Sequence, residues 1–285
     1  MQSLHVALIQ LAYNGSREAM MAQYRDLVAQ AAERGAQLVC LPEFSLTPYF
    51  PSSTDSSGFA WAEPLHGGGA DQFFGGLAAQ YHINIISNIF EQDEAGHFDT
   101  AVVHDRNGQI IGSTRKVHLP YGEGYHEPHF FEAGSSFPVH DLGDIKLAAP
   151  TCYDQWFPEM ARISAMNGAE FIYYPTAIGS EPTDPQIDTA ESWKTVMRGH
   201  AIANGVFIAA ANRVGIEPPV TFYGSSFICD PTGTILAQAG RDSTEVIDAV
   251  LQPQILEHWR ELFPLLKQRV PVHYSRLLEP YEGTS

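Results

Sequence analysis

The chain has 285 residues, of which 44% are hydrophobic and 17% charged, values that are ordinary for a globular protein and exclude a disordered one. Its net charge of −17, from 33 acidic and 16 basic residues, repels phosphate backbones and anionic lipids. We therefore expect neither a nucleic acid nor a membrane as a partner, and the charge favours cationic small molecules.

Short apolar runs of strand length alternate with segments whose apolar residues have helical spacing, a pattern that is typical of an α/β protein. In chain order, the pattern predicts a buried strand at residues 4–11 and a helix at 16–32, with Ser16 as its N-cap and Gly35 at its end. A strand at 38–41 follows and is stopped by Pro42.

The same alternation continues along the rest of the chain. A strand is predicted at 83–90 and a hairpin at 101–111, in which Asn107 and Gly108 supply the positive-φ residues of a tight turn. The pattern then predicts strands at 146–149, 171–174, 206–211, 225–229 and 235–238, and helices at 158–167 and 193–203.

Two segments repeat one order of features. GAQLVCLPE (35–43) and GAEFIYYPT (168–176) each pass from a helix end through Gly-Ala and an apolar strand to a proline. Any helix–strand connection in an α/β protein has part of this order, but we interpret the repeat as two similar halves. Two such halves packed sheet to sheet form a four-layer α-β-β-α sandwich. We treat residues 1–285 as one domain, in which the tail at 262–285 contacts the domain or a partner subunit.

Three widely spaced cysteines, without CxxC spacing, predict reduced thiols and a cytoplasmic protein. Residues 1–10 lack the pattern of a signal peptide, and no apolar run reaches the roughly 18 to 20 residues of a membrane-spanning helix. Cys40 and Cys229 lie in apolar strand runs and are interpreted as structural.

Cys152 is the candidate nucleophile because it stands between an apolar strand and a helix. Such a turn points the sulfur out of the sheet, and the helix N-terminus is expected to lower the pKa of the thiol. The N–H of Tyr153 is then placed to donate to an oxyanion.

Glu43 and Lys116 each follow a predicted strand directly. Such residues are more often exposed charges, although a carboxylate beside a buried strand is costly unless it is paired or functional. Together with Cys152 they supply a nucleophile, a base and a fixed cation for acyl transfer.

The segments LVCLPEF, STRKVHLP and PTCYDQWFPE resemble the three signature regions of the nitrilase superfamily, in that family's order. The likeness covers essentially the whole chain. It is closest to the branch of N-carbamoylputrescine amidases, through YPTAIGSEP, SWKTVMRGHAIANGV, AANRVG and FYGSSFICDPTG. The resemblance implies the α-β-β-α sandwich, a triad of Glu43, Lys116 and Cys152, and neither a metal nor an organic cofactor.

The resemblance also implies a second glutamate between the lysine and the cysteine, which Glu127 matches best, with Glu123 as the alternative. Family members usually form dimers or larger assemblies, so we expect a homo-oligomer. This chain departs from its plant relatives at 213–221, which we interpret as a shortened loop, and in its tail. Neither departure touches the triad.

The substrate prediction depends on residues near the nucleophile. Relatives that hydrolyse carbamoyl amino acids carry an arginine just after the cysteine, which suits a carboxylate, whereas here no Lys or Arg occurs between Cys152 and Arg162. Glu181 is predicted to receive a distal ammonium, against the alternative of a solvated loop charge. The further predicted substrate contacts are Tyr49, Tyr125, Trp156, Thr176 and Ala177.

We therefore predict hydrolysis of N-carbamoylputrescine to putrescine, carbon dioxide and ammonia through a thioester. A serine hydrolase is disfavoured because no GxSxG motif is present, and none of the twelve histidines has metal-site spacing. The alternatives are an aliphatic amidase, a carbamoyl-β-alanine hydrolase, a true nitrilase and a binding scaffold without activity.

Overall fold

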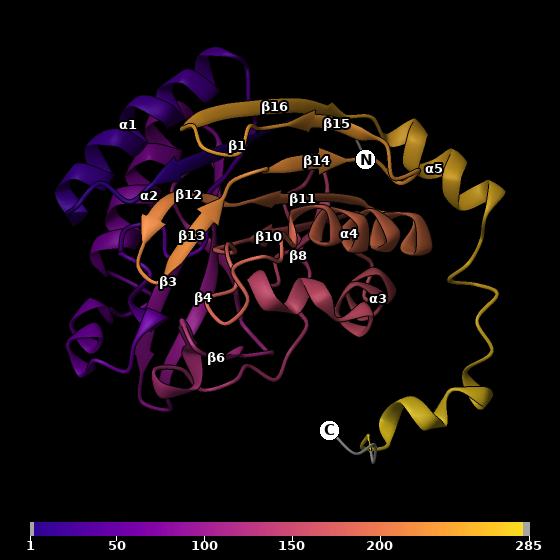
Figure 1. Ribbon diagram of the computed structural model, residues 1–285. Coiled ribbons are helices and arrows are strands. Elements are labelled where there is room, and N and C mark those ends of the chain that lie inside the picture. Colours follow the sequence, from indigo (N-terminus) through magenta and orange to yellow (C-terminus); the bar gives the residue numbers. More distant parts are fainter. Residues whose placement is uncertain (1–2, 282–285) are drawn as a thin grey trace.

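The computed structural model describes residues 3–281 (Figure 1), and the first of its two large sheets contains the first five strands of the chain. The strands of this sheet are β1 (Leu4–Ala12), β2 (Leu38–Cys40), β3 (Asn84–Asp93), β4 (Gly96–His104), β5 (Ile110–Arg115), β12 (Arg213–Glu217), β13 (Val220–Tyr223) and β16 (Glu245–Leu251). Their order is β13-β12-β1-β2-β3-β4-β5, with β16 paired to β1.

The second sheet packs against the first. Its strands are β8 (His140–Asp141), β9 (Lys146–Ala148), β10 (Phe171–Pro175), β11 (Phe207–Ala211), β14 (Phe227–Cys229) and β15 (Ile235–Gln238), in the order β15-β14-β11-β10-β9-β8. Strands β6 (Tyr121–Gly122) and β7 (Tyr125–His126) form a separate small hairpin.

The outer faces of the two sheets are covered by helices (Figure 1). The helices are α1 (Arg17–Glu33), α2 (Gly69–Tyr81), α3 (Pro158–Met166), α4 (Ala190–Asn204) and α5 (Pro253–Leu262). Single 3₁₀ turns occur at η1 (Phe50–Ser52), η2 (Ser56–Trp61), η3 (Glu127–His129), η4 (Cys152–Trp156), η5 (Pro271–His273) and η6 (Ser275–Leu278). No helix within residues 3–281 is both long and apolar enough to cross a membrane.

Three apolar clusters hold the layers together. Ile9 of β1 packs with α1 and α2 on the outer face of the first sheet, whereas its neighbour Leu8 packs with Phe171 and Phe207 between the sheets. On the far side, Trp193 of α4 packs on the second sheet. Because successive residues of a strand point to opposite faces, one apolar run serves two clusters. Each fully buried large side chain contributes about 1.5 to 3 kcal/mol.

The predicted four-layer sandwich is confirmed. The repeated segments become β2 and β10, and each lies parallel to both of its neighbours at the centre of its sheet. The two halves are nevertheless not separate, because β12, β13 and β16 from the second half complete the first sheet.

Several local predictions need correction. Residues 213–221 are not a loop but most of the antiparallel hairpin β12–β13. In the turn between β4 and β5 only Gly108 has a positive φ, since the Asp105 carboxylate accepts the N–H groups of Asn107 and Gln109 and builds a longer loop. Helix α2 was not predicted because it is rich in glycine, which weakens the helical pattern. One of these glycines has a packing reason, since a Cβ on Gly75 would lie 2.7 Å from the Gly108 carbonyl oxygen.

The predicted cap of α1 is present, with the Ser16 hydroxyl accepting the Ala19 N–H. At the other end of the chain, Leu266 still packs against the apolar cluster between α4 and the second sheet, and the residues beyond it run down the outside of the molecule (Figure 1). This segment exposes apolar side chains, with Val272 80% and Leu278 90% exposed.

Candidate active site

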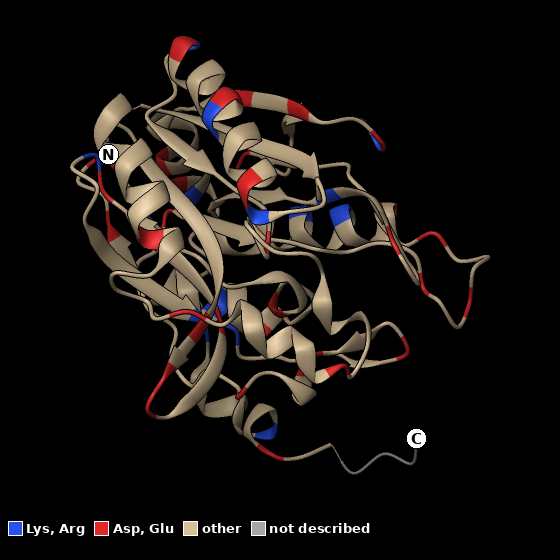
Figure 2. Cartoon of the chain, turned by 90° about the vertical axis from the view of Figure 1, so that its left-hand side faces the viewer, with Lys and Arg blue, Asp and Glu red and all other residues tan. Residues whose placement is uncertain are grey.

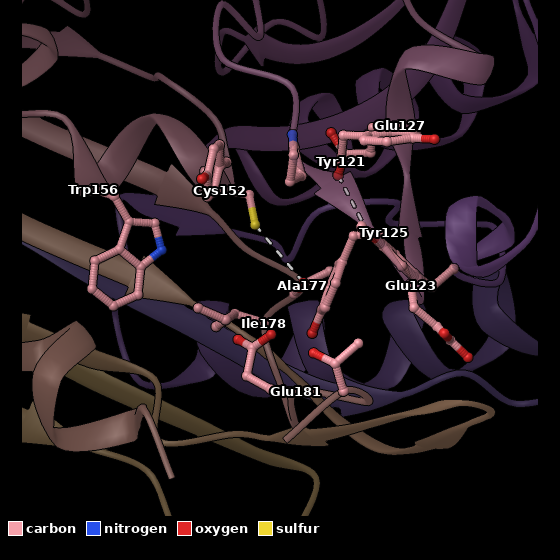
Figure 3. A pocket seen from close by; sticks show the side chains of 14 residues that line it. Tyr121, Glu123, Tyr125, Glu127, Cys152, Trp156, Ala177, Ile178 and Glu181 are labelled. Atoms are coloured by element: carbon pink, nitrogen blue, oxygen red, sulfur yellow. Dashed lines mark hydrogen bonds between the residues drawn. The ribbon is translucent and has the colours of Figure 1, made fainter. Parts of the chain in front are cut away.

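Cys152 lies on the sharp turn that follows β9. Its φ is +43°, a left-handed conformation that costs a non-glycine residue about 1 to 3 kcal/mol. The turn directs the sulfur toward the loop after β10, where Sγ lies 3.8 Å from the carbonyl oxygen of Ala177 (Figure 3). The predicted strand-to-helix turn is thus present, although the first turn is the 3₁₀ segment η4 and α3 begins only at Pro158.

Four charged side chains form a buried charge cluster: Glu43, Asp99, Lys116 and Glu127. Lys116 Nζ lies 2.8 Å from Glu43 Oε1, 2.5 Å from Glu127 Oε2 and 3.4 Å from Asp99 Oδ2. None of the four side chains is more than 1% exposed. The cluster brings three carboxylates around one ammonium group.

The carboxylates of the charge cluster have a spacing that would suit a cation, with one oxygen of each within 4.8 Å of the others. Lys116 Nζ contacts all three of them. The chain therefore supplies a cation at this place from its own side chains.

Burial dominates the ionisation of the site. Burial raises the pKa of Glu127 to about 7 and that of Glu43 well above its usual range, while Lys116 opposes both shifts. Burial disfavours the charged Lys116, but Glu127 and Glu43 together raise the pKa of its ammonium. The cation of the cluster is therefore held strongly, while the raised pKa values of Glu43 and Glu127 mean that these two carboxylates retain protons more readily than exposed ones.

The expectation of a lowered pKa for Cys152 is wrong. Burial raises the pKa of this thiol well above its usual range, and Glu43 raises it further. The helix-terminus effect that we expected is weak here because α3 starts six residues later and the sulfur faces carboxylates. The resting group is a thiol beside a carboxylate of raised basicity.

Hairpin β12–β13 fixes the loop that carries Glu43. Arg213 Nη1 donates to the carbonyl oxygens of Phe44 and Thr47, at 3.0 and 3.1 Å. Glu217 binds Arg213 Nη2 at 2.6 Å and accepts the Tyr49 N–H at 2.7 Å. Sequence reasoning missed both residues because their segment was interpreted as a loop.

A cavity of about 560 Å³ opens over Cys152 and Glu127 (Figure 3). Five predicted substrate contacts line it, namely Tyr49, Tyr125, Trp156, Ala177 and Glu181, together with Tyr153, Pro120, Tyr121, Gly122, Glu123, Ile178 and Thr183. No Lys or Arg occurs among the residues that line this cavity. Thr176 lies outside it, because its side chain is fully buried and its hydroxyl donates to the Tyr174 carbonyl at 3.0 Å.

The two alternatives for the second glutamate occupy different places. Glu127 belongs to the buried charge cluster and accepts a hydrogen bond from the Tyr49 hydroxyl at 3.3 Å. Glu123 is exposed in the cavity wall, in the hairpin β6–β7. The N–H of Tyr153 donates to no protein group within residues 3–281.

Asp99 is the member of the charge cluster that sequence reasoning missed. It lies in β4 between Phe98 and Thr100, just outside the range predicted as a hairpin. The available signal was an acidic residue beside an apolar run, which is costly to bury without a partner. Away from this site, acidic residues are distributed over many elements rather than gathered into one patch (Figure 2).

Comparison with known proteins agrees with this architecture. The model of the carbon-nitrogen hydrolase family matches residues 5–261. The chain is 36% identical to a citrullinase of Francisella tularensis, over 99% of this chain and 100% of that protein. It is 34% identical to the N-carbamoylputrescine amidase of Arabidopsis thaliana, over 96% of this chain and 94% of that protein.

A solved structure supports the same assignment. The carbon-nitrogen hydrolase from Helicobacter pylori G27 superimposes with a TM-score of 0.93 at 34% identity, covering 98% of this chain and 100% of that one. The fold and the site thus define an amidohydrolase with a thiol beside buried carboxylates. The chain belongs to the carbon-nitrogen hydrolase family, within the nitrilase superfamily, as its resemblance predicted.

Proposed function

We propose that this enzyme hydrolyses N-carbamoylputrescine to putrescine, carbon dioxide and ammonia. The observation that carries the proposal is the charge of the cavity, whose lining includes Glu123, Glu127 and Glu181 but no Lys or Arg. This substrate joins a neutral ureido group to a distal ammonium through four methylenes. A cationic end matches an acidic wall, whereas a carboxylate would be desolvated there without a partner.

Glu181 is the proposed partner of the ammonium. Its carboxylate is half-buried in the loop after β10, and burial raises its pKa. The nearby Tyr125 hydroxyl donates to the Ser180 carbonyl at 2.9 Å and so leaves the Glu181 carboxylate to the substrate. Tyr125 and Trp156 supply apolar surface for the methylene chain.

In the proposed mechanism Glu43 accepts the thiol proton as the sulfur of Cys152 attacks the ureido carbon. The carbonyl electron pair moves to oxygen, where Lys116 and the Tyr153 N–H stabilise the anion; one such donor is typically worth about 3 to 4 kcal/mol. Collapse breaks the bond to the terminal nitrogen, which leaves as ammonia with the proton from Glu43.

The remaining S-acyl group is a thiocarbamate, and water removes it. Glu43, supported by Glu127, takes a proton from that water as its oxygen forms a bond to the acyl carbon. The carbon–sulfur bond breaks and Cys152 regains its proton. The carbamate product then loses carbon dioxide and leaves putrescine.

Citrulline hydrolysis is the second candidate, favoured by the 36% identity to a citrullinase. Citrulline presents the same ureido group but ends in an α-amino acid, whose carboxylate finds no Lys or Arg in the cavity wall. Ammonia release from N-carbamoylputrescine, citrulline and N-carbamoyl-β-alanine, measured side by side, separates these candidates. Preference for either carboxylate-bearing substrate would contradict the proposed substrate.

Glu181→Gln tests the ammonium contact directly. Loss of a charged hydrogen bond worth about 1.5 to 3 kcal/mol raises KM for N-carbamoylputrescine by about tenfold or more, with a smaller effect on kcat. The matched control is Glu257→Gln on α5, because Glu257 is exposed, does not line the cavity and undergoes the same change of charge. An unchanged KM in Glu181→Gln would exclude the contact.

We also propose that the chain forms a homo-oligomer through residues 263–281. This segment exposes Val272 and Leu278 almost fully. Apolar side chains in an extended arm favour burial against a partner. Light scattering of the full chain and of residues 1–262 tests this, and the same number of subunits in the two assemblies would contradict it.

A further inference from the structure

Asp99 connects the two elements that carry Glu43 and Lys116. Its Oδ1 accepts a hydrogen bond from Asn88 Nδ2 at 2.6 Å, and Asn88 Oδ1 accepts the Phe44 N–H at 2.7 Å. The backbone carbonyl of Asp99 accepts the Lys116 N–H at 2.8 Å. Asp99 thus lies between the residue after Glu43 and the residue that bears the ammonium.

The buried charge cluster has more acceptors than donors. Asp99 Oδ2 and Glu43 Oε2 are both buried and accept no hydrogen bond within the described residues, although Asp99 Oδ2 lies 3.4 Å from Lys116 Nζ. One oxygen of each carboxylate lies within 4.8 Å of the other. Two ionised carboxylates this close repel each other, and a buried carboxylate oxygen that accepts no hydrogen bond is costly, most of all when the group is charged.

We propose that Asp99 is a positioning residue that accepts the O–H of protonated Glu43 in the resting enzyme and so sets the pH at which Glu43 becomes a base. In this arrangement Glu43 Oε2 carries the proton and donates it in a hydrogen bond to Asp99 Oδ2. As pH rises this proton leaves to solvent, and Glu43 is left ionised beside the thiol. The inference rests on the proposed role of Glu43.

The other groups around this pair set the balance of charge. The titratable groups that face it are Lys116, Glu127, Cys152, Tyr49 and Tyr173. Burial raises the pKa of Glu43, Lys116 lowers it, and Asp99 raises it again. Glu127 is held at Lys116, so its oxygens do not replace Asp99 as the partner of Glu43.

The test is the pH profile of kcat/KM for Asp99→Asn. The amide of this variant donates to Glu43 without adding a negative charge, so Glu43 ionises at lower pH. The acidic limb of the profile moves to lower pH by about one unit or more. At a pH below the wild-type limb, kcat/KM as a fraction of its maximum is therefore about tenfold higher in the variant than in the wild type. Asp99→Ser, which is smaller and neutral, moves the limb the same way if Asp99→Asn folds poorly.

Asp26→Asn is the control, because Asp26 is an exposed residue of α1 and the same change of charge there leaves the limb in place. Infrared difference spectra give a second readout that needs no substrate. Because Glu127, with a pKa of about 7, adds a protonated carboxyl band of its own, the band of the Glu43–Asp99 pair is the part that Glu127→Gln retains and Asp99→Asn loses. A limb unmoved in both Asp99 variants, or no such band in the resting enzyme, overturns the proposal. Failure of the enzyme to cleave any ureido compound refutes the proposed function instead, and the infrared band still decides where the proton lies.

Discussion

The buried charge cluster lies beneath the cavity, and only Glu127 of its four members lines the cavity itself, whereas the cavity walls are loops that face solvent. We call these two regions the floor and the wall. In the floor, Lys116 binds three carboxylates and none of the four side chains is more than 1% exposed. In the wall, Tyr121 is 83% exposed, and Glu123 lies in a hairpin of two residues per strand. The floor is held by close contacts among its own charges, whereas exposed loops such as those of the wall are where related proteins usually differ. Two relatives of similar identity carry the names citrullinase and N-carbamoylputrescine amidase, so a comparison of floor and wall bears directly on the substrate.

The floor should tolerate substitution least. Lys116→Met leaves three buried carboxylates without their cation, so the free energy of unfolding falls by about 3 to 5 kcal/mol and kcat/KM falls at least about 10³-fold. Urea unfolding and ammonia release measure the two effects. The exposed Lys146→Met, which lies outside both the cavity and the proposed subunit interface, serves as the control. Retained activity in Lys116→Met would show that the floor is not the catalytic unit.

Glu127 should give the floor a pH-dependent stability. Its pKa rises from an ordinary 4.5 to about 7 on folding, so the folded protein binds this proton more tightly. Its contribution to stability is therefore complete below pH 4.5 and is lost as pH rises through 7. Between these limits the wild type loses about 3 kcal/mol more than Glu127→Gln in urea unfolding. If the free energies of unfolding of the two proteins changed in parallel with pH, the raised pKa of Glu127 would be contradicted.

One buried side chain fixes the part of the wall that is formed by the loop after β10. Asn212 accepts the Ile178 N–H and donates to the Ile178 carbonyl, each at 2.9 Å, and so holds the loop that follows β10. Asn212→Ala loses about 1 to 3 kcal/mol of stability and raises KM more than it lowers kcat. The exposed Asn14→Ala is the control. A fall in kcat alone would mean that this loop belongs functionally to the floor.

Tyr49 links floor and wall and should give the smallest effect. Its hydroxyl donates to Glu127 over 3.3 Å while its ring lines the cavity. Tyr49→Phe removes a long hydrogen bond worth about 1 kcal/mol, so kcat/KM falls by less than tenfold. A loss comparable to that of Lys116→Met would place Tyr49 among the groups that move protons.

The features that the sequence could predict are those that depend on neighbouring residues along the chain. The apolar runs of β1, β10 and β11 determine their own strands, and the four layers follow from them. Glu43 and Lys116 were identified because motifs around strand ends are local. The pKa of Cys152 was not, because it depends on burial and on carboxylates from distant segments.

Other misses have equally physical reasons. Hairpin β12–β13 contains Gly215 and the pair Pro218-Pro219, which weaken any local strand pattern, and pairing with β1 supplies what the pattern lacks. Asp99 carries no motif of its own, and only the fold brings it to Lys116. The catalytic roles of the site residues stay predictions.

In the proposed mechanism Cys152 carries the substrate through a covalent intermediate. Rapid quenching of the enzyme with N-carbamoylputrescine, followed by intact mass spectrometry, tests this step most directly. We expect an adduct on Cys152 with the mass of the substrate less ammonia, and neither adduct nor ammonia release in Cys152→Ala. Ammonia release by Cys152→Ala at the wild-type rate would contradict it.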